Sequence, residues 1–164
     1  MKNILIILLV TFFCLGCKKE QEQKKEEEKE EGKEKIKNDN QNLQSFNHNG
    51  VDREYLAFIP SDYNSASAVP LVLNFHGFGG NSSEYSSYTS MEKLAEKENF
   101  ILVYPNGTEM NNYSHWNPSL PSSTNKSNAD DLGFIEMLIQ QLSIDYSIDS
   151  KRVYACGFSN GGMM

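Results

Sequence analysis

Blocks of apolar and polar residues alternate along the chain after residue 53, and they predict strands and helices in turn. Short apolar runs rich in β-forming residues predict strands, and apolar positions spaced by 3.6 residues predict helices. The predicted strands are 54–59, 69–76, 100–104 and 152–156, and the predicted helices are 84–99 and 130–146. This alternation predicts an α/β fold with a mostly parallel sheet and helices on both faces.

A polar segment, 108–129, interrupts this pattern. It contains Trp116, two prolines and many Ser and Asn residues, so it is predicted to be a long loop. Loops of this length are usually functional or mobile.

The N-terminus is predicted to be a targeting segment. Lys2 precedes an almost wholly apolar run, 4–13, which is too short to span a bilayer and has the length of a signal peptide core. The run ends at Leu15-Gly16-Cys17, which resembles the lipoprotein box of bacteria, although Cys14 stands where Leu is usual. We therefore expect 1–17 to be a lipoprotein-type signal peptide. Lipidation of Cys17 would anchor the chain to a membrane.

An ordinary cleaved signal peptide is the alternative. Both readings place the protein outside the cytoplasm, either secreted or lipid-anchored at the bacterial cell envelope.

Residues 18–45 are predicted to be a charged, disordered linker. Eight Lys and eight Glu fall within 18–37, which has almost no apolar residue to bury. The remaining range, 46–164, is predicted to be the folded domain.

Charge and cysteine content exclude several classes of protein. The formal net charge is −7, from 15 basic and 22 acidic residues, which argues against nucleic acid as a partner. Three cysteines do not make a disulfide framework. The C-x-x-C pattern of Cys14 and Cys17 has no second Cys or His pair at metal-ligand spacing, so no metal site is expected.

The sequence Gly157-Phe158-Ser159-Asn160-Gly161 has the pattern G-x-S-x-G. In this pattern a serine stands on a sharp turn between a strand and a helix, and the two glycines leave room for the turn. A predicted strand leads directly into it, so Ser159 is predicted to be a catalytic nucleophile. The alternative is a Gly/Ser loop without chemistry.

A glycine-rich segment, His76-Gly77-Phe78-Gly79-Gly80, follows the predicted strand 69–76. Acyl transfer needs N–H donors aimed at the oxyanion of the transition state. The backbone N–H groups of Phe78 and Asn160 are the predicted donors. A dinucleotide-binding loop is a weaker alternative, because Ser82 stands where its third glycine is required.

Four motifs in order resemble the polyhydroxybutyrate depolymerase and feruloyl esterase group of the α/β-hydrolase superfamily. They are residues 71–80, 104–107, 130–135 and 152–164, and the resemblance covers 46–164. It implies a serine carboxylic ester hydrolase without a cofactor. The implied substrates are feruloyl or acetyl esters of plant polysaccharide, or polyhydroxyalkanoate.

The rest of a catalytic triad is not expected within this chain. In such folds the acid and the histidine follow the serine, and five residues follow Ser159. His76 is expected to brace its turn, and His115 is a poor candidate for the base. Asp130 and Asp131 are expected to cap a helix. We therefore expect an α/β-hydrolase fold truncated after the nucleophile turn, and an inactive chain.

Two other functions remain open at this point. One is a fragment of a prolyl-oligopeptidase-type serine peptidase, which shares the serine turn. The other is a non-catalytic surface lipoprotein that binds polysaccharide through Trp116, Tyr113 and other aromatic residues.

Overall fold

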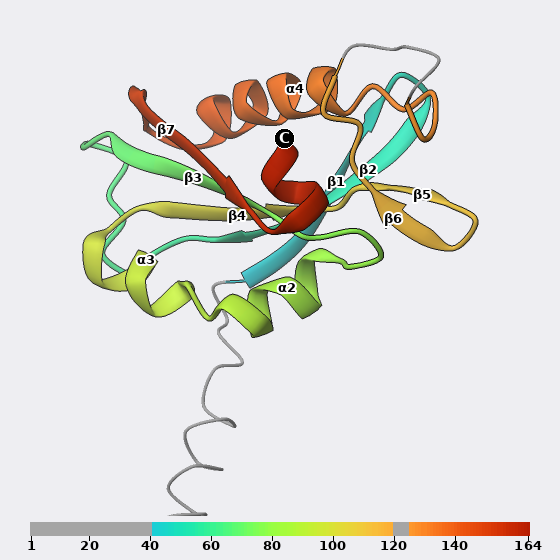
Figure 1. The fold of residues 1–164 in the computed structure, drawn as a ribbon. Coiled ribbons are helices and arrows are strands. Elements are labelled where there is room, and N and C mark those ends of the chain that lie inside the picture. Colours follow the sequence, from blue (N-terminus) through green and yellow to red (C-terminus); the bar gives the residue numbers. More distant parts are fainter. Residues whose placement is uncertain (1–40, 120–124) are drawn as a thin grey trace, which may run out of the picture. The chain divides into compact units, whose positions relative to one another are not determined.

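The computed structural model describes residues 41–119 and 125–164, and Figure 1 shows their arrangement. The predicted signal peptide, the lipidation site at Cys17 and residues 18–40 of the predicted linker lie outside the described residues. Asp39–Met164 makes one compact unit. No described helix has the length and apolar character needed to cross a membrane.

Five strands form the main sheet, in the order β1-β2-β4-β3-β7. Their bounds are β1 Gln41–His48, β2 Val51–Phe58, β3 Val69–Phe75, β4 Ile101–Pro105 and β7 Ile148–Gly157. Strands β4, β3 and β7 are parallel, whereas β2 runs antiparallel to both β1 and β4. The sheet is therefore mixed, with its three parallel strands β4, β3 and β7 at one end.

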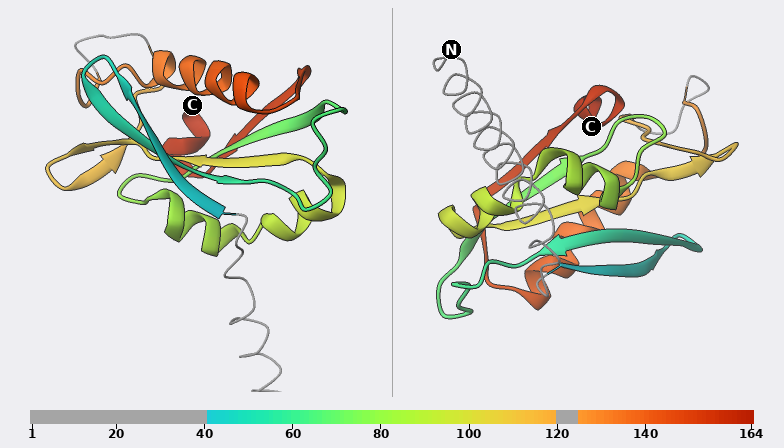
Figure 2. Two further views of the ribbon diagram at one scale, coloured as in Figure 1. Left: turned by 180° about the vertical axis from the view of Figure 1, so that it is seen from behind. Right: turned by 90° about the horizontal axis from the view of Figure 1, so that it is seen from below.

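Helices cover both faces of this sheet, as Figures 1 and 2 show. Helix α4 (Asp131–Asp145) packs on one face through Phe134, Leu138 and Leu142, which share a core with Leu71 and Leu73 of β3. Helices α2 (Ser82–Thr89) and α3 (Glu92–Glu98) lie on the other face, where Ala95 belongs to a second core with Phe58 and Leu102. The predicted α/β fold with helices on both faces is confirmed.

The predicted helix 84–99 is two helices. Asn81 caps α2 by accepting a hydrogen bond from the Glu84 N–H, and Ser90 ends it with φ at +49°. The left-handed conformation of Ser90 cannot continue a helix, so the chain turns before α3 begins. The apolar period across the segment gives no sign of this break.

Strand β1 lies partly inside the predicted linker. Residues 41–48 pair antiparallel with β2 through a two-residue turn at Asn49 and Gly50, where φ is +52° and +83°. Asn-Gly is the favoured sequence for such a hairpin turn. Residues 41–45 therefore belong to the folded part and not to the predicted linker, because cross-strand pairing orders a segment that is too polar to look like a strand.

The predicted loop 108–129 begins with a small hairpin. Strands β5 (Thr108–Met110) and β6 (Tyr113–His115) pair across Asn111 and Asn112, which have φ of +53° and +65°. Asparagine tolerates this conformation better than most residues. The hairpin replaces the first third of the expected loop.

Strand β7 is less buried than the sequence suggests. Tyr154 and Cys156 are exposed, and among residues 152–156 Val153 alone is partly buried. The reason is topological, since β7 is an edge strand of the described sheet, with β3 as its one partner. An apolar run alone does not distinguish an edge strand from a central one.

Candidate active site

The turn after β7 places Ser159 at the surface. The strand ends at Gly157, and a short 3₁₀ helix, η1 (Ser159–Met163), begins two residues later. Ser159 is exposed and has φ at +52°, in the left-handed region that residues other than glycine rarely adopt. A strained serine on a strand-to-helix turn is the geometry that the G-x-S-x-G pattern predicts.

The two glycines of the pattern are required by close backbone contacts. A methyl group on Gly157 would collide with the carbonyl of Gly161, and one on Gly161 would collide with the carbonyl oxygens of Phe75 and His76. The end of β7 and the start of η1 therefore lie directly against the end of β3. No larger residue fits either position without moving the backbone.

The segment after β3 lies beside the serine turn. Register pairs Phe75 with Gly157, so both strands end at the same edge of the sheet. A Cβ atom on Gly77 would lie 3.2 Å from the Phe158 ring and 3.6 Å from the Ser159 Cβ. The predicted nucleophile and the predicted oxyanion segment are thus neighbours, although 80 residues separate them in the sequence.

The loop at Phe78 leaves its backbone N–H available. The Gly79 N–H donates to the Ser114 carbonyl at 2.7 Å, and the Gly80 N–H donates to the Gly77 carbonyl at 3.1 Å. The Phe78 N–H has no acceptor among the described residues. The Phe78 ring is half exposed and stacks on Tyr113, with 5.6 Å between ring centroids.

Behind the exposed serine lies a buried group of three residues, His76, Trp116 and Asn160, which we call the Trp116 cluster. The Asn160 side chain accepts from the Trp116 N–H at 2.8 Å and donates to the Trp116 carbonyl at 3.0 Å. The Trp116 indole N–H donates to the His76 carbonyl at 3.0 Å. The cluster therefore ties the residue after Ser159 to the start of the predicted oxyanion loop.

Sequence reasoning did not find this connection. Trp116 was a candidate for sugar binding, and its side chain is fully buried. Burial makes Trp116 a packing residue and removes it from any binding surface. The one local sign of this connection in the sequence is the amide side chain of Asn160, which can both donate and accept hydrogen bonds.

His76 braces its own turn, as expected. Its Nε2 accepts from the Gly107 N–H at 3.0 Å, so Nδ1 carries the proton and donates to the Gly77 carbonyl at 2.7 Å. Burial lowers the pKa of His76, and the hydrogen bond to Gly77 opposes that shift. With both ring nitrogens occupied by backbone groups, His76 does not serve as a base for Ser159.

The other two histidines also lie in separate places. His115 is fully buried, and its Nε2 lies 2.8 Å from the Ser127 Oγ. His48 in β1 lies 3.3 Å from the carboxylate of Asp130. The sequence contains three histidines, all within the described residues, and none of them hydrogen-bonds to Ser159.

The two aspartates at the start of α4 have different roles. Asp130 is the N-cap, because its carboxylate accepts from the Gly133 N–H at 3.0 Å. Asp131 is buried instead and accepts from Arg53 at 2.7 Å and from the Asn117 N–H at 2.8 Å. Asp130 therefore caps the helix, as predicted. Asp131 instead forms a buried ion pair with Arg53 and holds the backbone of Asn117, the residue next to Trp116.

A small pocket opens beside the serine turn. Its volume is about 260 Å³, and four aromatic residues line much of it, namely Phe78, Tyr85, Tyr88 and Phe158. Among residues 41–119 and 125–164, no group of three or more His, Cys, Asp or Glu side chains is arranged to hold a metal ion. The groups available at this site are therefore the exposed hydroxyl of Ser159, the backbone N–H groups beside it, and the aromatic side chains that line the pocket.

The sequence is similar to those of known esterases. The model of an esterase family, described as "Putative esterase", matches residues 47–164. Feruloyl esterase B of Thermothelomyces thermophilus is 32% identical over 125 residues, which are 76% of this chain and 41% of that protein. The bifunctional acetylxylan esterase/xylanase XynS20E of Neocallimastix patriciarum is 36% identical over 115 residues, which are 70% of this chain and 15% of that protein.

Solved structures agree on the fold. An S-formylglutathione hydrolase from Agrobacterium tumefaciens matches 74% of this chain and 50% of its own, with a TM-score of 0.61 and 14% identity. The acetyl xylan esterase of Aspergillus awamori matches 73% and 43%, with a TM-score of 0.55 and 22% identity. The chain thus spans half or less of these proteins. Since the family model covers nearly all of the folded unit, the chain belongs to this esterase family and has the α/β-hydrolase architecture over the part that it spans.

Proposed function

We propose that this chain carries the nucleophile and the oxyanion donors of a serine carboxylic ester hydrolase that acts on feruloyl or acetyl esters of polysaccharide. The observation that carries the proposal is the exposed, strained Ser159 beside the Gly77–Phe78 loop. Its relatives named as feruloyl and acetylxylan esterases support the substrate class. The polyhydroxyalkanoate alternative stays a prediction.

The proposed chemistry follows from the geometry. The Ser159 Oγ attacks the ester carbonyl carbon, and its proton passes to a base. The negative charge that develops on the carbonyl oxygen is stabilised by the Phe78 and Asn160 N–H groups. Collapse releases the alcohol and leaves an acyl-serine, which water then hydrolyses.

The base does not come from the three histidines of this chain. His76 has backbone partners at both ring nitrogens, His115 is buried against Ser127, and His48 lies at the start of α4. We therefore expect no Ser159-dependent turnover of p-nitrophenyl acetate by the 164-residue chain alone. Turnover that Ser159→Ala abolishes would contradict this part of the proposal.

Imidazole offers a test of the nucleophile that does not need the missing base. The chain is incubated with a small fluorophosphonate, with and without imidazole, and the labelled residue is identified by peptide mass spectrometry. We expect imidazole-dependent labelling of Ser159, because the free imidazole replaces the absent base. Ser61 and Ser83, which are also exposed, are internal controls. Equal labelling of all three serines would refute the nucleophile assignment.

We also propose lipid anchoring through Cys17, which the lipoprotein-like N-terminus supports. The chain is expressed in a bacterium fed with a radiolabelled fatty acid. Label is expected in the wild-type chain and not in Cys17→Ser. A labelled Cys17→Ser chain, or an unlabelled wild type, would favour the ordinary signal peptide.

A further inference from the structure

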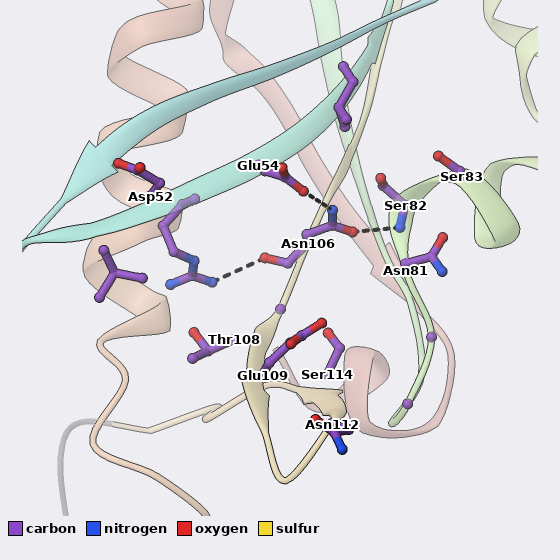
Figure 3. Close-up of a pocket in the computed structure, with 16 residues that line it drawn as sticks. Asp52, Glu54, Asn81, Ser82, Ser83, Asn106, Thr108, Glu109, Asn112 and Ser114 are labelled. Atoms are coloured by element: carbon purple, nitrogen blue, oxygen red, sulfur yellow. Dashed lines mark hydrogen bonds between the residues drawn. The ribbon is translucent and has the colours of Figure 1, made fainter.

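A second, larger pocket borders the Gly77–Gly80 loop at Gly79 and Gly80. Its volume is about 720 Å³, which is within the usual range of ligand sites. Three parts of the chain surround it, namely the β1–β2 hairpin, residues 79–83 and the β5–β6 hairpin (Figure 3). We call it the polar pocket and define it by six side chains, namely Asp52, Glu54, Asn81, Ser83, Glu109 and Asn112.

The lining of the polar pocket is rich in acceptors. Asp52 accepts from Asn47 and Glu54 accepts from Asn106, so each of these carboxylates is held in place. Glu109 makes no hydrogen bond or ion pair with any other described residue and faces the pocket in Figure 3. A ligand that donates several hydrogen bonds would satisfy these oxygens.

The same lining argues against other classes of ligand. Three carboxylates face one cation, Arg53, which is 4% exposed and already paired with Asp131, so an anion is disfavoured. No metal-binding group of side chains occurs among the described residues. The lining contains no aromatic ring, so a flat apolar ligand has no stacking surface inside it.

An aromatic surface lies next to the pocket, on the same two segments. Tyr113 follows Asn112 in the hairpin, and Phe78 precedes Gly79 in the loop. Their rings are stacked on each other, and Tyr113 is 57% exposed. Acceptors for hydroxyl groups beside an exposed ring of this kind suit a sugar, whose rings have polar edges and apolar faces.

The pocket is close to the serine turn. Gly79 lines it, whereas Gly77 contacts the Phe158–Ser159 turn. Two residues of backbone span at most roughly 7 Å. The same loop therefore borders both the pocket and the serine turn.

We propose that the polar pocket binds neutral sugar units of a polysaccharide main chain. This proposal adds carbohydrate binding to the proposed ester hydrolysis. It rests on the proposed esterase function only for the choice of a xylan fragment as the probe. Glu54 and Glu109 accept hydrogen bonds from sugar hydroxyls, and the amides of Asn81 and Asn112 bind them from opposite walls.

The test measures binding without catalysis. The Ser159→Ala chain is titrated with xylotetraose by isothermal titration calorimetry, and saturable binding is expected. The double variant Glu109→Ala/Asn112→Gly should weaken binding about tenfold, because it removes two groups that bond the sugar. Glycine is chosen at 112 because φ there is +65°. Glu136→Ala, an exposed carboxylate on α4, is the matched control and should bind as tightly as the parent.

A second variant changes a different wall of the pocket, the one formed by α2. Ser83 is exposed on α2, and Ser83→Phe should fill the pocket and reduce xylotetraose binding without touching the hairpin. Circular dichroism and the fluorescence of Trp116, the single tryptophan, report whether each variant is folded.

Three results would overturn the proposal. They are the absence of saturable xylotetraose binding, unchanged affinity in both the double variant and Ser83→Phe, and binding of spermidine in place of the neutral sugar. Sugar binding without imidazole-dependent labelling of Ser159 would refute the esterase proposal alone. Labelling without sugar binding would refute the polar pocket alone.

Discussion

Ser159 lies on the outer side of the turn that follows β7, and Trp116 packs against the inner side of the same turn. The surroundings of the two residues differ. Ser159 is exposed, with a left-handed backbone. Trp116 is fully buried and bonded through its backbone and its ring to Asn160 and His76. The comparison teaches that the side chain of the proposed nucleophile is left free, while the backbone beneath it is held by buried hydrogen bonds. Substitutions on the buried side test how far it controls the exposed side.

The largest effect is expected at Asp131, whose carboxylate accepts a hydrogen bond from the N–H of Asn117, the residue next to Trp116. Asp131→Ala removes the carboxylate that pairs with the buried Arg53 and accepts from the Asn117 N–H, and it leaves Arg53 with only the Asn106 carbonyl among its described acceptors. We expect the free energy of unfolding to fall by about 3–5 kcal/mol, the usual cost of breaking a buried ion pair from one side. Urea unfolding, followed by Trp116 fluorescence, measures it. A loss under about 1 kcal/mol would show that Arg53 finds another partner or water.

Gly161→Ala should be nearly as damaging. The new methyl group would collide with the carbonyls of Phe75 and His76, so the serine turn would have to move away from β3. About 3 kcal/mol of destabilisation is expected, at the upper end for overpacking. Gly162→Ala is the matched control, because its nearest atom would lie at 3.1 Å and its effect should be under about 1 kcal/mol. Equal effects at both positions would contradict the packing argument.

Asn160→Ala is expected to cost about 2 kcal/mol. It leaves the Trp116 N–H and carbonyl buried without their partner. The emission of Trp116 should shift to longer wavelength as the loop loosens and water enters. Imidazole-dependent labelling of Ser159 should fall as well, because the loosened turn no longer holds the backbone N–H of residue 160, a proposed oxyanion donor, in place. Unchanged emission and labelling together would mean that the Trp116 cluster does not position the serine turn.

A smaller effect is expected on the pH dependence of stability, through His76. Burial lowers its pKa in the folded state, against about 6.5 in an unfolded chain. As the pH falls below about 6.5, the unfolded chain binds a proton that the folded chain resists, so stability is lost. Unfolding measured in urea at about pH 7.5 and about pH 5.5 should show this loss. His76→Gln should show a smaller one, and an identical loss in the variant would remove His76 as the cause.

The smallest change is expected at Ser159 itself, and it has the opposite sign. Ser159→Gly relieves the left-handed strain at φ +52° and should stabilise the chain by roughly 0.5–1 kcal/mol. Ser159→Ala keeps the strain and should leave stability nearly unchanged. If glycine gives no more stability than alanine does, the turn is not strained.

Much of the fold could be predicted from local patterns. Strands β3 and β4 are runs of apolar, β-forming residues, and their positions follow from those runs because a central parallel strand is buried on both faces. Helix α4 follows from its apolar period and from the capping Asp130. The polar strand β1 and the β5–β6 hairpin could not be found in this way. Both depend on pairing with a neighbour and on asparagines in turns.

For this protein the sequence by itself determined the α/β order, the G-x-S-x-G turn at Ser159 and the glycine-rich loop after β3, since each depends on residues close together in the chain. Only the tertiary structure decided that Asp131 pairs with Arg53 and that Asn160 is bonded to Trp116. These contacts join residues 44 to 78 positions apart. They depend on which strands become neighbours, and a linear pattern of residue types does not contain that information.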